Sequence, residues 1–144
     1  MTYGEAESTL ILNRLVTQWG LYADQHRVAD QVALMTPTAT FRVYRDDHVV
    51  TELTGTDDLT QALTRWGQRY PKHFTLTAQP LITLDTDNGT ADGQVNAQIK
   101  TVGDKGITSV FSVRFDDHYA FNGENWAIAS RDAHVIMVST RSDS

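Results

Sequence analysis

The fold is decided by residues 108–138, which read TSVFSVRFDDHYAFNGENWAIASRDAHVIMV. In the first half, a mostly apolar series recurs at every second position, and only the charged Asp117 breaks it: Ile107, Ser109, Phe111, Val113, Phe115, Tyr119 and Phe121. A second alternation starts at Trp126 and reaches Val138 with one slip of parity. A period of two is typical of a strand with one face on a core. The stretch therefore predicts two long, adjacent strands.

A short turn at Asn122-Gly123-Glu124 is expected to join these two strands. Asparagine and glycine tolerate the positive φ angles that a tight hairpin turn requires. Strands of about ten residues or more are longer than the usual five or six. Such a long ribbon must twist and curl, and it needs something apolar to fold around.

Length and composition describe one domain of an ordinary soluble protein. The chain has 144 residues, 40% of them hydrophobic and 21% charged, which is enough for a single sizeable core. We expect one domain over residues 1–144, with an ordered core over about residues 8–138. Residues 139–144 are small and polar, and we expect them to form a frayed tail.

Charge and residue usage exclude several classes of function. The net charge of −6, without a run of Lys or Arg, argues against nucleic acid and anionic membrane as partners. The absence of cysteine excludes disulfides and thiolate metal sites, and we expect neither a metal nor a cofactor. The polar, acidic N-terminus and the absence of a membrane-length apolar run predict a cytoplasmic protein.

Three helices are expected in the first half of the chain. Residues 12–26 carry apolar side chains at spacings of three and four, about five helical turns, with Ser8 near the N-terminal end. A short second helix is expected over residues 30–35, before a proline. A third helix over residues 56–70 has Thr56 as its expected cap.

Strands are expected between and after these helices. Residues 38–44 and 49–53 predict a strand pair, and the chain is nearly all strand from residue 73 onward. Helices followed by a meander of strands are typical of the α+β class. We expect a curved antiparallel sheet of about five or six strands wrapped around three helices, with an apolar pocket at the open end. Because the outer face would be uncovered, we also expect a homodimer through it.

Three local patterns resemble the SnoaL-like proteins of the nuclear transport factor 2-like superfamily, which includes ketosteroid isomerase-like and scytalone dehydratase-like proteins. Residues 19–41, WGLYADQHRVADQVALMTPTATF, resemble the helix–Asp–helix–strand opening of that family. Residues 72–95, KHFTLTAQPLITLDTDNGTADGQV, resemble its strand that starts with histidine. Residues 115–132, FDDHYAFNGENWAIASRD, are similar to its final tyrosine–turn–tryptophan–arginine pattern. The resemblance covers roughly residues 10–138 and implies a cone-shaped, cystatin-like α+β barrel.

The resemblance also implies candidate site residues. Family members include dehydratases of polycyclic and steroid-like alcohols, isomerases, polyketide cyclases and many proteins without known activity. In the dehydratase branch an aspartate and a histidine act together, with tyrosines nearby and sometimes an arginine. Carried over by position, these residues are Asp24, His73, Tyr44 and Arg131.

Asp24 and His73 would transfer a proton at carbon if they face one pocket. Desolvation in an apolar pocket makes a carboxylate a stronger base, so Asp24 would be the base. His73 would be its partner, or the acid that protonates a leaving hydroxyl. Tyr44 would donate to a substrate carbonyl and stabilise an enolate. The expected reaction is loss of water or isomerisation of a small apolar hydroxylated or ketonic ring compound, without a cofactor.

Each of these residues has a structural alternative. Asp24 could be solvated at a helix end, and the ring of His73 could bond to backbone. Arg131 either anchors a substrate oxyanion or pairs with Asp132 or Asp117 on the sheet surface, and the surface pair is favoured.

The aromatic candidates are also open to two interpretations. Trp19, Trp66 and Phe115 either line a substrate site or fill the core, and the core is favoured because aromatic residues dominate cores. The second function is a non-catalytic binding or dimerisation module of the same fold. Hydrogen bonding between the candidates inside an apolar cavity would favour an enzyme, and a filled cavity would favour the module.

Overall fold

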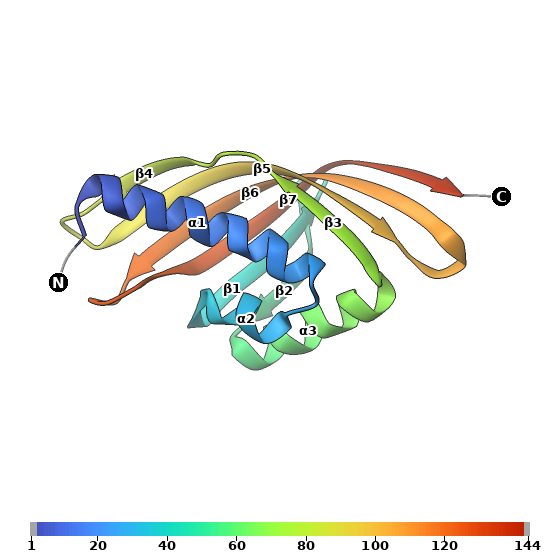
Figure 1. Ribbon diagram of the computed structural model, residues 1–144, viewed down its shortest axis with the longest axis horizontal. Coiled ribbons are helices and arrows are strands. Elements are labelled where there is room, and N and C mark those ends of the chain that lie inside the picture. Colours follow the sequence, from blue (N-terminus) through green and yellow to red (C-terminus); the bar gives the residue numbers. More distant parts are fainter. Residues whose placement is uncertain (1–2, 143–144) are drawn as a thin grey trace.

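The computed structural model describes residues 3–142, which form three helices and a seven-stranded sheet (Figure 1). The helices are α1 (Glu5–Asp24), α2 (Val28–Ala33) and α3 (Thr56–Arg69), and a 3₁₀ turn, η1, spans Asp104–Gly106. The strands are β1 (Met35–Arg45), β2 (His48–Thr54), β3 (Lys72–Thr77), β4 (Leu81–Asp85), β5 (Thr90–Val102), β6 (Ile107–Phe121) and β7 (Trp126–Ser142). The α+β prediction is confirmed.

The sheet is mixed rather than antiparallel throughout. Its order is β2-β1-β7-β6-β5-β3, with β4 beside β5. β1 runs parallel to β7, and the other pairs are antiparallel. The expectation of five or six antiparallel strands is therefore corrected. Alternation identifies a strand, but it specifies neither the partner of that strand nor its direction.

The nearly continuous strand expected from residue 73 onward is interrupted between β3 and β4. Residues 78–80 between them form no strand, and this break contains Pro80. Proline has no N–H to donate to a strand partner, so it interrupts a ladder. The division adds one strand to the number expected from the sequence.

The ribbon of β6 and β7 forms the centre of the sheet. Its pairing runs from Phe121 with Trp126 to Ile107 with Ser142, so β7 continues past residue 138, where the ordered core was expected to end. Two register shifts, rather than the single slip read from the sequence, leave Ala129 and Ile136 without a direct partner. Each shift has the character of a β-bulge, which bends a strand and increases its twist.

α1 lies across the concave face of the sheet (Figure 1) and contributes much of its core. Leu12, Leu15 and Val16 are buried there. Ser8 lies inside the helix rather than at its start, and its buried Oγ accepts a hydrogen bond of 3.2 Å from the indole of Trp126. The helix therefore begins before Ser8, at Glu5.

The shorter helices begin and end near their expected positions. α2 starts at Val28 and ends before residue 35, so Met35 opens β1 instead of ending the helix. Gly55 is the N-cap of α3 and Thr56 its first helical residue. Within residues 3–142, no helix has both the length and the apolar character needed to cross a membrane.

A close contact between α1 and β3 positions the candidate site. A Cβ atom on Gly20 would lie 3.0 Å from Cγ2 of Thr75 and 3.1 Å from Oγ1 of Thr77. The missing side chain lets the helix backbone approach the strand. Asp24 follows one turn later, at the last residue of α1, and this approach brings it to the inner face of β3.

Candidate active site

The last residue of α1 and the start of β3 form an aspartate–histidine pair. His73 Nδ1 lies 2.6 Å from Asp24 Oδ1. The backbone N–H of Thr75 donates to Asp24 Oδ2 at 2.8 Å, and the Thr75 hydroxyl donates to Asp24 Oδ1 at 2.8 Å. The side chains of His73 and Asp24 are only 4% and 13% exposed. The carboxylate therefore accepts three hydrogen bonds that hold it in place.

This network assigns the proton on the His73 ring. The Asp24 carboxylate accepts, so Nδ1 of His73 carries the hydrogen. On the other side, Nε1 of Trp66 lies 3.2 Å from Nε2 of His73. An indole N–H can only donate, so Nε2 is the acceptor. His73 is thus a neutral ring whose Nε2 lone pair points away from Asp24.

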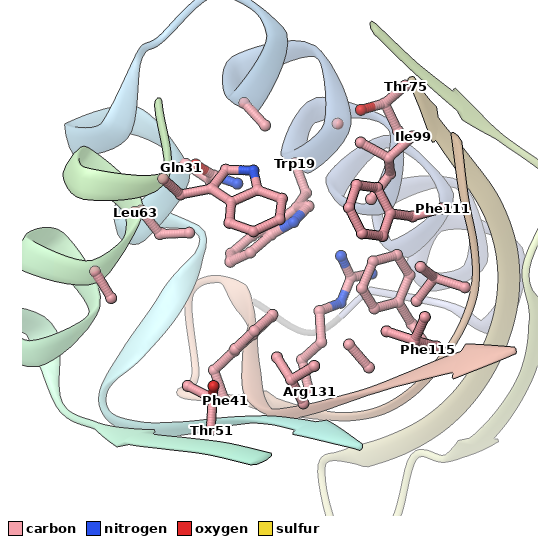
Figure 2. A pocket seen from close by; sticks show the side chains of 18 of the residues that line it. Trp19, Gln31, Phe41, Thr51, Leu63, Thr75, Ile99, Phe111, Phe115 and Arg131 are labelled. Carbon is pink, nitrogen blue, oxygen red and sulfur yellow. The ribbon is translucent and has the colours of Figure 1, made fainter. Parts of the chain in front are cut away.

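A cavity of about 490 Å³ lies between the helices and the concave face of the sheet (Figure 2). His73 and Thr75 line its wall, whereas Asp24 supports His73 from behind and is not among the lining residues. Most of the lining is apolar or aromatic, including Trp19, Phe41, Leu63, Trp66, Ile99, Phe111, Phe115 and Val135. The cavity is therefore an apolar chamber with a histidine in its wall.

A buried cation lines the same cavity. Arg131 Nε and Nη2 donate to the two carboxylate oxygens of Asp117 at 2.7 and 2.8 Å. The guanidinium carbon lies 4.0 Å from the ring centre of Phe115 and 5.1 Å from that of Trp19, and Figure 2 shows Arg131 extending towards these two rings. Aromatic faces attract cations, so the arginine is held by one carboxylate and two rings.

Tyr119 completes this buried network. Its hydroxyl donates to Asp117 Oδ2 at 2.6 Å. Burial and, next, the adjacent Asp117 carboxylate raise the pKa of the Tyr119 phenol above its usual range. Tyr119 therefore stays protonated and acts as a hydrogen-bond donor. Asp117, the charged residue that interrupts the apolar side of β6, is the acceptor for both Tyr119 and Arg131.

A buried amide also faces the cavity. Gln31, on α2, is 3% exposed and is one of the lining residues (Figure 2). Its position in the cavity wall places this residue beside any molecule that enters the cavity.

The structure brings together six of the seven site residues named from the sequence. Asp24 and His73 are hydrogen-bonded. The four candidates for substrate binding all line the cavity, namely Trp19, Trp66, Phe115 and Arg131. The favoured alternative also holds for Trp19 and Phe115, which belong to the buried core. The Arg131–Asp117 pair forms as favoured from the sequence, but it is buried rather than on the surface, because Asp117 lies on the inner face of β6.

Tyr44 does not reach the cavity, and the role expected for it is corrected. Neighbouring residues of a strand point to opposite faces. Phe41, Val43 and Arg45 of β1 line the cavity, which places Tyr44 on the outer face. There its ring stacks on His134 with centres 4.5 Å apart. Tyr44 cannot donate to a molecule bound beside His73.

Two site residues were not identified from the sequence. Thr75 shares the inner face of β3 with His73 because it lies two positions later, and this period-two signal could have identified it. Gln31 had no comparable signal, because nothing in a short helical segment marks one amide as buried. Within the described residues, no three His, Cys, Asp or Glu side chains form a group that could hold a metal ion.

Comparison with known proteins gives the family and the fold. A family model described as SnoaL-like domain matches residues 4–132. No functionally curated protein matches the sequence.

Several solved structures share the fold at low sequence identity. A proposed scytalone dehydratase from Novosphingobium aromaticivorans is 12% identical with a TM-score of 0.81, covering 96% of this chain and 91% of that one. The hexachlorocyclohexane dehydrochlorinase LinA-type3 from Novosphingobium barchaimii is 8% identical with a TM-score of 0.83, covering 96% and 93%. A proposed aromatic-ring hydroxylase from Novosphingobium aromaticivorans is 15% identical with a TM-score of 0.85, covering 96% of each chain. With the family model matched over nearly its whole length, the chain belongs to the SnoaL-like domain family.

Proposed function

We propose that the protein is a cofactor-independent lyase or isomerase. It removes a proton from carbon, next to a carbonyl or a leaving group, in a small apolar hydroxylated or ketonic ring compound. The observation that carries this proposal is the 2.6 Å contact between His73 and Asp24 at the wall of an apolar cavity. Hydrogen bonding between these two residues inside such a cavity favours an enzyme over a purely binding module.

His73, rather than Asp24, is assigned as the base. All three donors around Asp24 are protein groups, and Asp24 does not line the cavity. The Nε2 atom of His73 is the basic atom at the wall. Asp24 holds the ring in the tautomer that leaves Nε2 unprotonated, and it stabilises the cation that forms when Nε2 takes a proton.

Two polar groups are suited to the rest of the substrate. The Arg131 guanidinium would stabilise negative charge that develops on an oxygen or a leaving group, and its effect is large because the surroundings exclude water. The Gln31 amide would orient a polar substituent. The cavity volume of about 490 Å³ lies within the range of about 300–1,000 Å³ that is usual for small-molecule sites.

The structural neighbours are compatible with this chemistry. One is a dehydrochlorinase and another a proposed dehydratase, and both names denote elimination reactions. At these identities the likeness establishes the fold alone, so the reaction is inferred from the site of this chain.

Deuterium exchange tests the proposal without knowledge of the natural substrate. Ring ketones such as 2-tetralone are incubated in D₂O with the protein, and loss of the α-proton signal is followed by NMR. We expect the wild type to accelerate exchange and His73→Gln to lose about 100-fold or more of that rate.

A second histidine–aspartate pair provides the matched control. His118 Nδ1 lies 2.6 Å from Asp92 Oδ1 on the exposed outer face. His118→Gln should therefore exchange as fast as the wild type. Full activity in folded His73→Gln protein would remove His73 from the mechanism.

We also propose that two copies pair through the outer face of the sheet. This face exposes Phe74 and Leu76 of β3 and Met137 of β7, and the register aligns Leu76, Gln98, Ser112 and Met137 in one row across four strands. Burial of the apolar side chains of Phe74, Leu76 and Met137 would stabilise a dimer. Sedimentation at micromolar concentration should give a dimer and Leu76→Lys a monomer, whereas a monomeric wild type would contradict the proposal.

A further inference from the structure

The lone pair assigned to the base is already occupied in the protein without ligand. Nε1–H of Trp66 donates to Nε2 of His73 at 3.2 Å. A neutral imidazole has one lone pair in the ring plane at this nitrogen. Removal of a proton from a bound molecule requires that same lone pair. The Trp66 hydrogen bond and the proposed reaction therefore exclude each other.

Trp66 is more exposed than the other two tryptophans. Its side chain is 37% exposed, whereas Trp19 and Trp126 are 6% and 7% exposed. It packs on Tyr70 and Phe111, with ring centres 4.5 and 5.9 Å away, and these contacts leave one side towards solvent.

The helix that carries Trp66 is itself weakly anchored. Among the residues of α3, only Leu59 is buried. A small shift of α3, or a rotation of the indole alone, would release Nε2 of His73. Rotation of the indole alone leaves the buried Leu59 in place.

We propose that Trp66 is a positioning and specificity residue that caps His73 until a suitable molecule displaces it. The inference rests on the proposed role of His73 as the base. A molecule displaces the indole when it offers its own hydrogen to Nε2, as an O–H or an acidic C–H on an apolar ring does. A molecule of the same shape without such a hydrogen leaves the cap in place.

A matched pair of probes separates this cap from general packing. Phenol offers an O–H to Nε2, whereas anisole has a similar ring and cannot donate. Their dissociation constants are measured by NMR titration in the wild type and in Trp66→Phe, which keeps an aromatic ring but removes the N–H.

The expected change lies in the preference for the donor. A net intramolecular hydrogen bond contributes enough to change binding about two- to tenfold, so Trp66→Phe should improve phenol binding by that factor relative to anisole. An equal change for both probes would show that only space was altered, and it would overturn the proposal.

The indole resonances report displacement directly in the wild type. The Trp66 indole N–H signal, identified by its loss in Trp66→Phe, should move on saturation with phenol towards its position in His73→Phe. The Trp126 indole donates to Ser8 Oγ at the same distance of 3.2 Å and should stay unchanged. A Trp66 signal that stays fixed while phenol shifts the His73 ring nitrogens would overturn the proposed role of Trp66. It would leave the role of His73 as the base intact. Deuterium exchange unaffected by His73→Gln would instead refute the assignment of His73 as the base.

Discussion

Substitution of Asp117 by asparagine tests whether the buried Arg131–Asp117 pair stabilises the fold. Arg131 and Asp117 are both buried and are joined by two short hydrogen bonds. Removal of one charge of a buried pair costs about 3–5 kcal/mol because the other charge is left uncompensated. The asparagine oxygen still accepts one of the two bonds, and the rings of Phe115 and Trp19 still face the cation. We therefore expect a loss of about 3 kcal/mol, the lower end of that range.

Urea unfolding with linear extrapolation measures this loss. The neighbouring Asp116 provides the control, because its carboxylate pairs with His134 and Gln94 at the exposed outer face. Asp116→Asn should change the free energy of unfolding by about 1 kcal/mol or less.

A double-mutant cycle adds a second criterion. Asp117→Asn combined with Arg131→Met should cost less than the sum of the two single changes, by about 1–3 kcal/mol. Equal unfolding free energies for Asp117→Asn and Asp116→Asn, or strictly additive effects, would refute the idea that the Arg131–Asp117 pair stabilises the fold.

Three further outcomes are expected. Thr75→Val removes the hydroxyl bond to Asp24 and should lower the free energy of unfolding by about 1.5–3 kcal/mol in urea titrations; an unchanged value would show that this bond contributes nothing. The Tyr119 phenol, with its raised pKa, stays protonated while an ordinary phenol ionises above about pH 10, so the unfolded chain then binds fewer protons and stability should fall by up to about 1.4 kcal/mol per pH unit. Tyr119→Phe should flatten that fall, and an equal slope in both proteins would contradict it. Gln31→Leu should alter which ring ketones exchange deuterium, because Gln31 lines the cavity, and an unchanged ketone preference would remove Gln31 from recognition.

Much of the fold was predictable because it depends on local patterns. The alternation in β6 places Asp117 on the inner face, as the structure confirms. The parallel pairing of β1 with β7 was not predictable, because alternation carries no information about strand direction. The second bulge, at Ile136, was not predicted. Residues 135–138 are all apolar, so an extra residue there does not disturb a visible alternation of apolar and polar side chains.

The site was predictable where residue positions carry the information. The resemblance named Asp24 and His73 together, and the structure places them in contact. Tyr44 was misplaced although the alternation of Phe41 and Val43 already assigned it to the other face. Trp66 was a candidate for the site, although the core was favoured. Its bond to His73 depends on the place of α3, which contacts α2, β1 and β2, and no local pattern encodes that place.

The most direct test of the proposed chemistry is the ¹⁵N NMR spectrum of the His73 ring nitrogens in the folded protein. We predict a proton on Nδ1, bonded to Asp24, and an unprotonated Nε2 whose signal shifts when phenol enters the cavity. In Asp24→Asn the preference of the proton for Nδ1 over Nε2 should be lost together with the deuterium exchange activity. A neutral ring with its proton on Nε2 would contradict the assignment of His73 as the base.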